Sequence, residues 1–379
     1  MLLGNTYTIP NIVNLPGQSG GVDYGDDFAF IMQTDAANET VTLRGNGATG
    51  SWYNYDIDWG DGITESYLNV QTVTHTYADA GDHVIRISGQ YGGFRSDIST
   101  YTTRKITEVL NWGKTCFYNF NWMFTDQSRL TSVPDIIAYD WTESSIGPAP
   151  GTATKQFIRT FASLSILPPS GPSGPQLTRC VLKDTEFDSL TDIFRGNVYC
   201  EYLEISNCTQ RLLGSAGNSN PNYYVGTQVT GGCEVVLKDI TFNPSVNLDL
   251  TGFLRRVKFK SLTIDNIDCS NFTNPAGFLT LRYFFEGCEF PQDEDVVFKM
   301  QLPSTDADID FDHFAYYITG SPNTLDFSQV TTGPNGRINT YDMSYFHNQD
   351  ATASRSTGFR FIDGLNKFKA SSGRSFFGL

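Results

Sequence analysis

One short run constrains the fold of this chain more than any other: DIDWGDG at residues 56–62, followed by His75-Thr76-Tyr77 and by an apolar segment that starts at Gly81. Asp61 and Gly62 predict a tight hairpin turn, because Gly tolerates positive φ and Asp hydrogen-bonds its own backbone. Trp59 and the Val- and Ile-rich segments predict strands and core. The run therefore indicates a small antiparallel β unit whose motif residues build a scaffold.

The stretch from about residue 26 to residue 90 resembles the PKD domain family, whose members are small immunoglobulin-like β-sandwiches. The resemblance rests on the W-G-D-G run, on the H-x-Y at 75–77 and on Gly81 with the strand after it. It implies a structural turn and its packing partners, namely Trp59, Gly60, Asp61, Gly62, His75 and Tyr77. A metal loop of the EF-hand type is disfavoured at Asp56, Asp58 and Asp61, because Gly60 stands where such a loop carries Asp or Asn.

Composition predicts a mainly β chain of two units. At 379 residues the chain exceeds the size at which one hydrophobic core usually stops growing. Only 18% of the residues are charged and 35 are Gly, which favours turn-rich β structure over helix. The net charge of -15 disfavours binding to phosphate backbones, so no nucleic-acid partner is expected.

Cysteine usage and hydropathy indicate a protein made in a reducing cytoplasm. The seven cysteines contain no C-x-x-C pair, so neither a disulfide framework nor a zinc cluster is expected, and the thiols are predicted to be reduced and mostly buried. The first residues lack the basic and apolar pattern of a secretory signal peptide. No apolar run approaches the ~20 residues that span a bilayer, so no membrane insertion is expected.

After residue 105, aromatic residues recur at a nearly constant spacing. The positions are Phe124, Phe161, Phe194, Phe253, Phe285, Tyr317, Phe346 and Phe377. Neighbours lie 29 to 37 residues apart, except for one interval of 59 that fits a missing position near residue 222. A period between 20 and 50 residues is typical of a solenoid of stacked coils. We expect each aromatic step to lie in a short helix or turn at one edge of a coil.

The beginning of this region resembles the BspA-like branch of leucine-rich repeats. The resemblance rests on Trp112-Gly113, on Trp122-Met123-Phe124 and on the L-T-S-V-P run at 130–134. It implies an irregular leucine-rich-repeat solenoid with short helices or turns. The expected units are an extended arm at 1–25, a PKD-like β-sandwich at 26–104 and the BspA-like solenoid at 105–379.

Few residues suggest chemistry. The histidines at 75, 83, 313 and 347 have no Ser, Cys or second His at a spacing typical of a catalytic triad or metal site. One anomaly is a strand-like alternation that places Asp306, Asp308, Asp310 and Asp312 on one face. Two interpretations stay open for it: a solvated face, which is favoured, and a Ca²⁺ site. No other cofactor is expected.

A candidate surface contact lies at Tyr223 and Tyr224, which come after the loop-forming segment 217–221. Aromatic side chains in such a setting stack on sugar rings or anchor protein interfaces. Most other aromatic residues are expected in the core.

These features together favour a non-enzymatic structural or display protein. A PKD-like module followed by BspA-like coils is similar to an arrangement in tailed-phage virion proteins and in bacterial surface proteins. We expect a capsid decoration, tail or fibre component on the virion surface, made in the host cytoplasm. Its expected partners are other virion proteins, further copies of the chain, and a host surface glycan or protein for attachment.

Two alternatives stay open. The first is a bacterial cell-surface adhesin, which the missing export signal disfavours because an adhesin must cross a membrane. The second is a tailspike-type glycan depolymerase, in which two carboxylates brought together in space would cut a polysaccharide.

Overall fold

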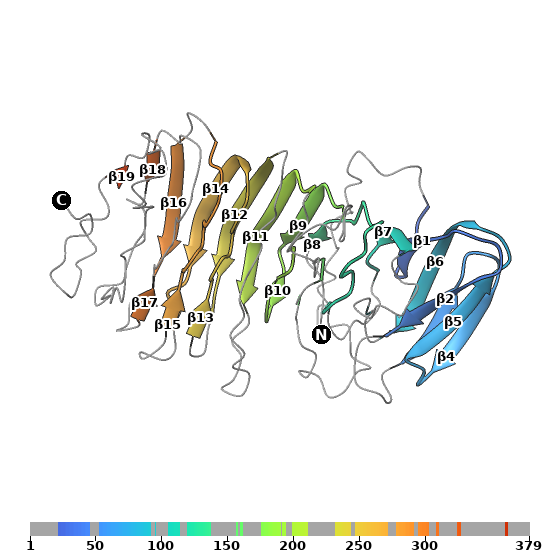
Figure 1. The fold of residues 1–379 in the computed structure, drawn as a ribbon. Helices are drawn as coiled ribbons and strands as arrows, with labels where there is room; N and C mark the ends of the chain where they lie inside the picture. Colours follow the sequence, from blue (N-terminus) through green and yellow to red (C-terminus); the bar gives the residue numbers. More distant parts are fainter. Residues whose placement is uncertain are drawn as a thin grey trace, which may run out of the picture.

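The fold is mainly β, as predicted. The computed structural model describes residues 22–45, 53–91, 105–113, 120–137, 176–190, 199–210, 232–243, 247–271, 278–291 and 295–302, with short pieces at 95, 157, 160–161, 192–194, 308–310, 324–326 and 361–362. This part of the chain contains strands and turns but no α-helix, and therefore no helix that would cross a membrane. Figure 1 shows an elongated molecule with antiparallel strands at one end and a row of parallel strands beyond them.

The N-terminal unit is an antiparallel β-sandwich. Its strands are β1 (Phe28–Thr34), β2 (Glu39–Arg44), β3 (Asn54–Asp58), β4 (Thr64–Leu68), β5 (Thr72–Tyr77), β6 (Gly81–Gln90) and β7 (Ile106–Asn111). The larger sheet has the order β4-β3-β6-β1-β7, and the smaller sheet pairs β2 with β5. Alternate residues of β5 are buried, as expected for a sheet with one face on the core and the other in water.

Strand β7 belongs to the sandwich and also begins the parallel strands. On one edge it pairs antiparallel with β1, where Val109 lies opposite Phe30. On its other edge Glu108 forms a parallel bridge with Ser132, and the Val109 amide donates to the Ser132 carbonyl at 2.9 Å. The expected domain bounds place β7 wholly in the second unit, whereas its hydrogen bonds join it to both.

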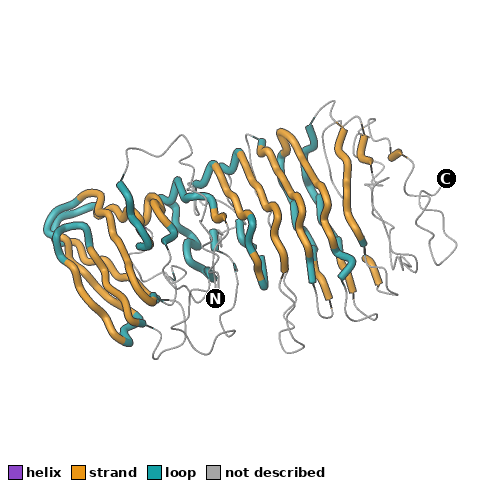
Figure 2. The backbone as a smooth tube through the Cα atoms, turned by 180° about the vertical axis from the view of Figure 1, so that it is seen from behind, coloured by secondary structure: helices purple, strands orange, loops and turns teal. Residues whose placement is uncertain are grey.

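The parallel-sheet region comes after β7, and its strands form two parallel sheets. The larger sheet contains β8 (Ile136–Ile137), β9 (Arg179–Lys183), β10 (Glu186–Phe187), β11 (Tyr202–Gln210), β12 (Cys233–Thr241), β14 (Phe259–Asp268), β16 (Asp295–Gln301), β18 (Thr324–Asp326) and β19 (Phe361–Ile362). A smaller parallel sheet contains β13 (Asn247–Asp249), β15 (Phe278–Thr280) and β17 (Asp308–Asp310). The two sheets run side by side along the molecule (Figures 1 and 2).

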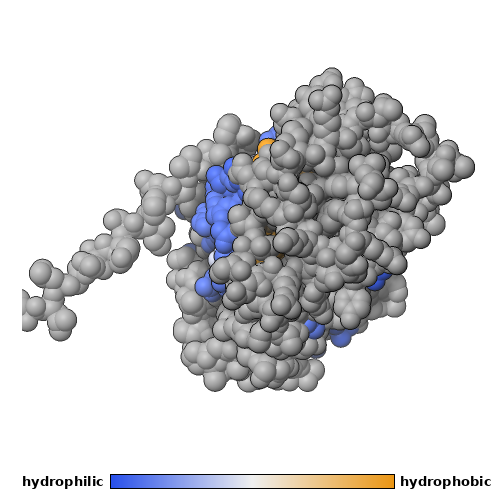
Figure 3. Space-filling model, turned by 90° about the vertical axis from the view of Figure 1, so that its left-hand side faces the viewer, coloured by the Kyte–Doolittle hydropathy of each residue, from blue (hydrophilic) through white to orange (hydrophobic). Residues whose placement is uncertain are grey.

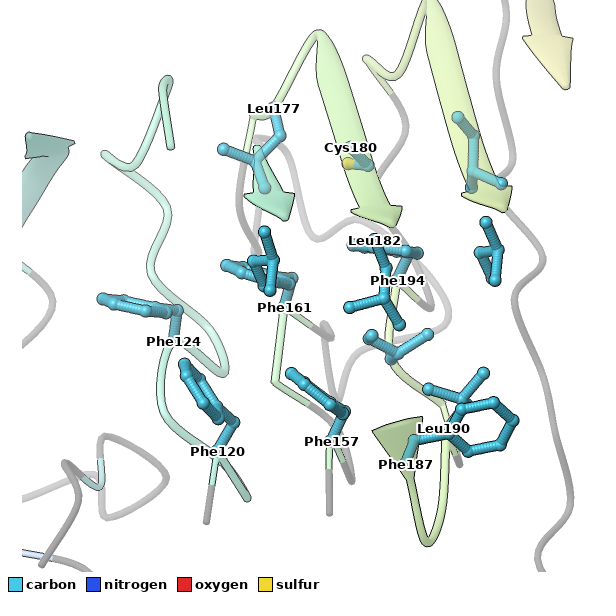
Figure 4. Packing of buried hydrophobic residues seen from close by; sticks show 14 of the residues in the cluster. Phe120, Phe124, Phe157, Phe161, Leu177, Cys180, Leu182, Phe187, Leu190 and Phe194 are labelled. Carbon is cyan, nitrogen blue, oxygen red and sulfur yellow. The ribbon is translucent and has the colours of Figure 1, made fainter. Parts of the chain in front are cut away.

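Aromatic rings stack from coil to coil inside this region (Figure 4). The ring centroids of Phe124 and Phe161 are 5.6 Å apart with planes 5° from parallel, and Phe161 continues the stack to Phe194 at 5.6 Å and 12°. Phe120 and Phe157 form a second stack at 5.0 Å. All five side chains are buried. The spacing of the aromatic positions in this part of the sequence therefore marks positions that repeat in space.

The coil at 251–256 keeps an aromatic residue but shifts it by one position, whereas the coil at 282–287 does not. The sequence predicted a short helix or a turn at each aromatic step, and residues 121–126, 251–256 and 282–287 form turns. The fourth residue of these turns is Phe124, Leu254 and Phe285, and the Leu254 amide donates to the Phe284 carbonyl at 2.9 Å. Phe253 stacks on Phe284 instead. The choice of Phe253 as the repeating position was therefore wrong by one residue, because a Leu fills that core position.

Trp112 packs against both units. Its ring stacks on Phe28 of β1, with centroids 6.2 Å apart, and meets Phe120 and Phe161 edge-on at 5.6 and 6.3 Å. Its Nε1 donates to the Pro134 carbonyl at 2.9 Å, so the one polar atom of the indole is satisfied. The sandwich and the first coils therefore share one hydrophobic core.

The Phe124, Phe161 and Phe194 stack predicts a large cost for truncating its middle ring. Phe161→Ala should lower the free energy of unfolding by about 3–5 kcal/mol, because it leaves a cavity between two coils. Phe161→Leu should cost clearly less. Ile137→Ala, at a side chain that is 49% exposed, is the control and should change stability by less than about 0.5 kcal/mol. Chemical denaturation measures all three, and equal effects of Phe161→Ala and Ile137→Ala would contradict the stack.

Candidate interaction surfaces

The W-G-D-G run forms the loop between β3 and β4. The Trp59 amide donates to the Ile63 carbonyl at 3.0 Å, so the reversal spans residues 59–63 and is wider than a tight two-residue turn. Gly60 and Gly62 have φ values of 80° and 91°. The Asp61 carboxylate accepts from the Ile63 amide at 3.1 Å, which holds the loop from within.

His75 and Tyr77 fasten this loop to the opposite sheet. The His75 ring stacks on Trp59 at 4.6 Å, and its Nε2 lies 2.8 Å from Asp61 Oδ2. The Tyr77 hydroxyl donates to the Trp59 carbonyl at 2.9 Å. Partial burial favours the protonated acid, but the hydrogen bond with His75 outweighs it and lowers the pKa of Asp61. All six motif residues thus lie at one end of the sandwich, where Trp59 and Asp61 of the loop contact His75 and Tyr77 of the smaller sheet.

Sequence reasoning missed Glu65, which completes this network. Its Oε2 accepts from the Tyr67 hydroxyl at 2.5 Å and from Trp59 Nε1 at 2.8 Å. These two hydrogen bonds, the one from Tyr67 first, lower the pKa of Glu65. The only sequence signal for this role is a carboxylate on the same face of a strand as an aromatic residue two positions later.

The other candidate residues are only partly within the described chain. Asp308 and Asp310 lie in β17, in register with Phe278 and Thr280 of β15. Asp306, Asp312, Tyr223 and Tyr224 lie outside the described residues. Within the described ranges, no three His, Cys, Asp or Glu side chains gather in a way that would hold a metal ion.

The outward face of the larger parallel sheet is polar, and its residues lie in register. One row across β9, β11, β12 and β14 consists of Lys183, Ser206, Lys238 and Asp265. Lys299 of β16 extends the row with an ion pair to Asp265 at 3.0 Å. In the end-on view of Figure 3 most of the coloured surface is hydrophilic. We call the side of the sheet that carries this row the outer face.

A second row of the outer face consists of four residues in the left-handed conformation. They are Asp184, Asn207, Asp239 and Asn266, with φ between 48° and 56°. Asn207 donates to Asp184 at 2.5 Å, and Asn266 donates to Asp239 at 2.7 Å. Asp and Asn tolerate this conformation better than other non-Gly residues, which explains why they alternate here. The sequence signal was present, since each comes after a short apolar strand and one polar residue.

The row ends at β16. Ile264 and Ile267 of β14 pair with Phe298 and Met300, so β16 has one residue fewer between the paired positions. Compared with the coil of β16, each of the coils that contain β9, β11, β12 and β14 therefore has one extra residue, and this extra residue is the left-handed one.

Glu204 lies in the middle of the outer face, and its ionised carboxylate accepts hydrogen bonds. Its two oxygens accept from the Tyr202 hydroxyl at 2.8 Å and from Ser206 Oγ at 2.6 Å. Burial favours the protonated form, but these bonds outweigh it and the pKa of Glu204 is lowered. The Arg179 guanidinium lies 4.5 Å from the centre of the Tyr202 ring and pairs with Asp135 at 2.7 Å. The face therefore offers fixed hydrogen-bonding groups.

A charged cluster joins the sandwich to the first coils. Arg129 holds Asp35 with two bonds, at 2.8 and 3.1 Å, and Lys105 contacts Asp35 at 2.9 Å and also Glu39. The bonds from Arg129 and then from Lys105 lower the pKa of Asp35, and Lys105 lowers that of Glu39. Two carboxylates of the sandwich therefore meet two cations that come later in the chain.

The six described cysteines are buried and form no disulfide, as predicted. Burial raises the pKa of Cys208 to about 12 and raises those of Cys269 and Cys288 further, so these thiols stay protonated. They pack as small apolar residues. Cys116 lies outside the described residues.

Comparison with known proteins identifies one part of the chain. The PKD domain model matches residues 29–91, which confirms the PKD resemblance over β1 to β6. No curated protein and no solved structure matches the chain.

The two glycines of the loop should differ in their tolerance of a side chain. Gly62→Ala should cost about 1–2 kcal/mol, because an L-residue is strained at this φ while its Cβ would meet nothing within 4 Å. Gly60→Ala should cost about 1–3 kcal/mol more, since its Cβ would lie 2.4 Å from the Val84 carbonyl oxygen. Thermal unfolding of the two variants measures the difference, and equal stability would contradict this loop geometry.

The charged cluster predicts a loss of stability in acid. Because the folded-state pKa values of Asp35 and Glu39 are lowered, the contribution is fully present above their ordinary values of 3.8 and 4.5 and is lost as the pH falls through the lowered values. Arg129→Gln should flatten the dependence of unfolding free energy on pH below about 4.5. Lys238→Gln, on the outer face, is the matched control and should leave the dependence unchanged; the same slope in both variants would argue against the cluster.

Proposed function

We propose that this protein is a non-enzymatic structural and display component of a tailed-phage virion, in the class of capsid decoration, tail or fibre proteins. In this proposal the parallel-sheet region is a BspA-like leucine-rich-repeat solenoid. Its outer face binds a host surface glycan or protein, and the sandwich joins it to other virion proteins.

The observation that carries the proposal is the register of the outer face. Its polar side chains repeat from strand to strand, and many are fixed by bonds to their neighbours, such as Asn207 to Asp184 and Lys299 to Asp265. Fixed donors and acceptors lose little conformational entropy when they bind. A surface of this kind suits recognition of an extended polar ligand better than it suits catalysis.

The order of the two units supports the same proposal. A PKD domain precedes coils whose Trp112-Gly113 and Met123-Phe124 steps resemble BspA-like repeats. The shared strand β7 makes a stiff connection between a unit that docks and a unit that displays, because a hinge there would break hydrogen bonds on both edges of one strand.

Proteomics of purified particles tests the location. We expect the protein in particles at several copies each, resistant to washing with high salt. Its absence from particles, together with its presence in the bacterial envelope fraction, would favour the adhesin alternative instead.

Binding to host cells tests the display role. Glu234 and Thr263 are exposed and lie on the outer face, on the same side of their strands as Lys238 and Asp265. Glu234→Arg and Thr263→Arg should weaken binding of the purified protein at least about 10-fold, while Thr74→Arg on the sandwich should not. Incubation with host polysaccharide should release no reducing ends, and release of such ends would support the depolymerase alternative.

A further inference from the structure

We propose that the open edge of strand β4 pairs with β4 of a second copy of this chain, in antiparallel register about a two-fold axis through Ser66. The proposal is independent of the virion assignment. It concerns the edge of the sandwich sheet opposite to β7, whose own outer edge is occupied by the parallel-sheet region.

The backbone of β4 presents a complete set of hydrogen-bonding groups at this edge. In the β3 and β4 pair, the Asn69 amide donates to the Tyr53 carbonyl and the Trp59 amide donates to the Ile63 carbonyl. Hydrogen-bonded and non-hydrogen-bonded residue pairs alternate along an antiparallel pair of strands. The backbone amides and carbonyls of the odd-numbered residues of β4 therefore face β3, and those of Thr64, Ser66 and Leu68 face away from it. Among the described residues, β4 pairs with β3 alone.

Apolar side chains gather at the same edge. Ile63 is 47% exposed, Leu68 is 67% exposed and Val70 is 36% exposed, and these are three of the six exposed large hydrophobic residues in the described chain. Natural proteins usually protect an edge strand with Lys, Pro or a bulge. Residues 63–70 contain neither Lys nor Pro, and the register between β3 and β4 has no shift.

Charge explains why a second copy fits this edge although the chain as a whole carries a net charge of -15. The only charged residue in 63–70 is Glu65, and its carboxylate is already bonded to Trp59 and Tyr67 on the side of its own chain. The next carboxylates, Asp56 and Asp58 of β3, lie beside Ser66 and Thr64 and are one strand further from the second copy. The two paired strands themselves therefore bring no free carboxylate against each other.

The strand is also complementary to itself. With Ser66 opposite its symmetry mate, Thr64 lies opposite Leu68 of the second copy, and all three residues direct their free backbone groups toward the partner strand. Pairing would extend one sheet across both molecules. The strand is short, so we expect a weak dimer rather than an obligate one.

Sedimentation equilibrium from about 10 µM to about 1 mM tests the dimer. The weight-average mass of the wild-type protein should rise toward twice the monomer mass. Leu68→Lys should shift the midpoint at least about 10-fold toward higher concentration, because it replaces an apolar side chain at the pairing edge with a charged one that has no opposite charge to meet in Thr64 of the second copy. Ser66→Pro should have the same effect, since it removes an amide that faces the partner and not β3. Thr74→Lys, on the exposed face of β5, is the matched control and should associate like the wild type.

A cysteine cross-link tests the register. Ser66→Cys should form a disulfide-linked dimer with glutathione disulfide as the oxidant, which is reduced to two molecules of glutathione, because paired Cα atoms at such a site lie ~5.5 Å apart. Thr64→Cys should not, since its mate lies opposite position 68. A wild-type protein that stays monomeric at all concentrations would overturn the proposal, as would equal cross-linking of the two cysteine variants. Circular dichroism confirms that each variant is folded before it is compared.

Discussion

A single strand with two hydrogen-bonded edges determines how this molecule is built. β7 closes the antiparallel sheet against β1, and the same residues bond in parallel to the segment around Ser132. An edge of unpaired backbone groups is costly to leave open, and here the first coil covers it. Trp112, directly after β7, makes the core continuous from the sandwich to the first coils by packing on Phe28 and on Phe120.

Register explains most of the architecture beyond β7. In a parallel sheet of coils, equivalent residues of successive coils lie side by side, so a residue type that suits one position is stacked on itself along the molecule. Inside, this produces the Phe124, Phe161 and Phe194 stack. Outside, it produces the row that starts with Asp184 and Asn207, in which each Asn satisfies the Asp of the preceding coil. The same constraint thus orders the core and the surface.

The sequence predicted the features that depend on local chemistry or on repetition. The W-G-D-G loop arises from residues that tolerate positive φ, and the stacked coils arise from aromatic residues at a steady interval. It did not predict that β7 serves both units, because the pairing of Glu108 with Ser132 depends on how the chain returns after a turn. The role of Glu65 was also hidden, since its partner Trp59 lies across a loop whose width the sequence does not specify.

The shift at Phe253 has a similar cause. Leu and Phe fill the same core position equally well, so aromatic spacing alone locates the repeat to within one residue, whereas the backbone bonds between Leu254 and Phe284 settle it. The candidate metal and tyrosine positions were chosen from local patterns, and only Asp308 and Asp310 among them fall in a described strand.

Amide hydrogen exchange measured by mass spectrometry tests the central claim, that β7 joins both sheets. Peptides that cover residues 106–111 should be as strongly protected as peptides from β6 and β11, because this strand is hydrogen-bonded to a neighbour on each edge and its amides exchange only when the two sheets separate. Exchange in 106–111 that is orders of magnitude faster than in β6 and β11 would contradict this account and would make the segment a linker between two independent units.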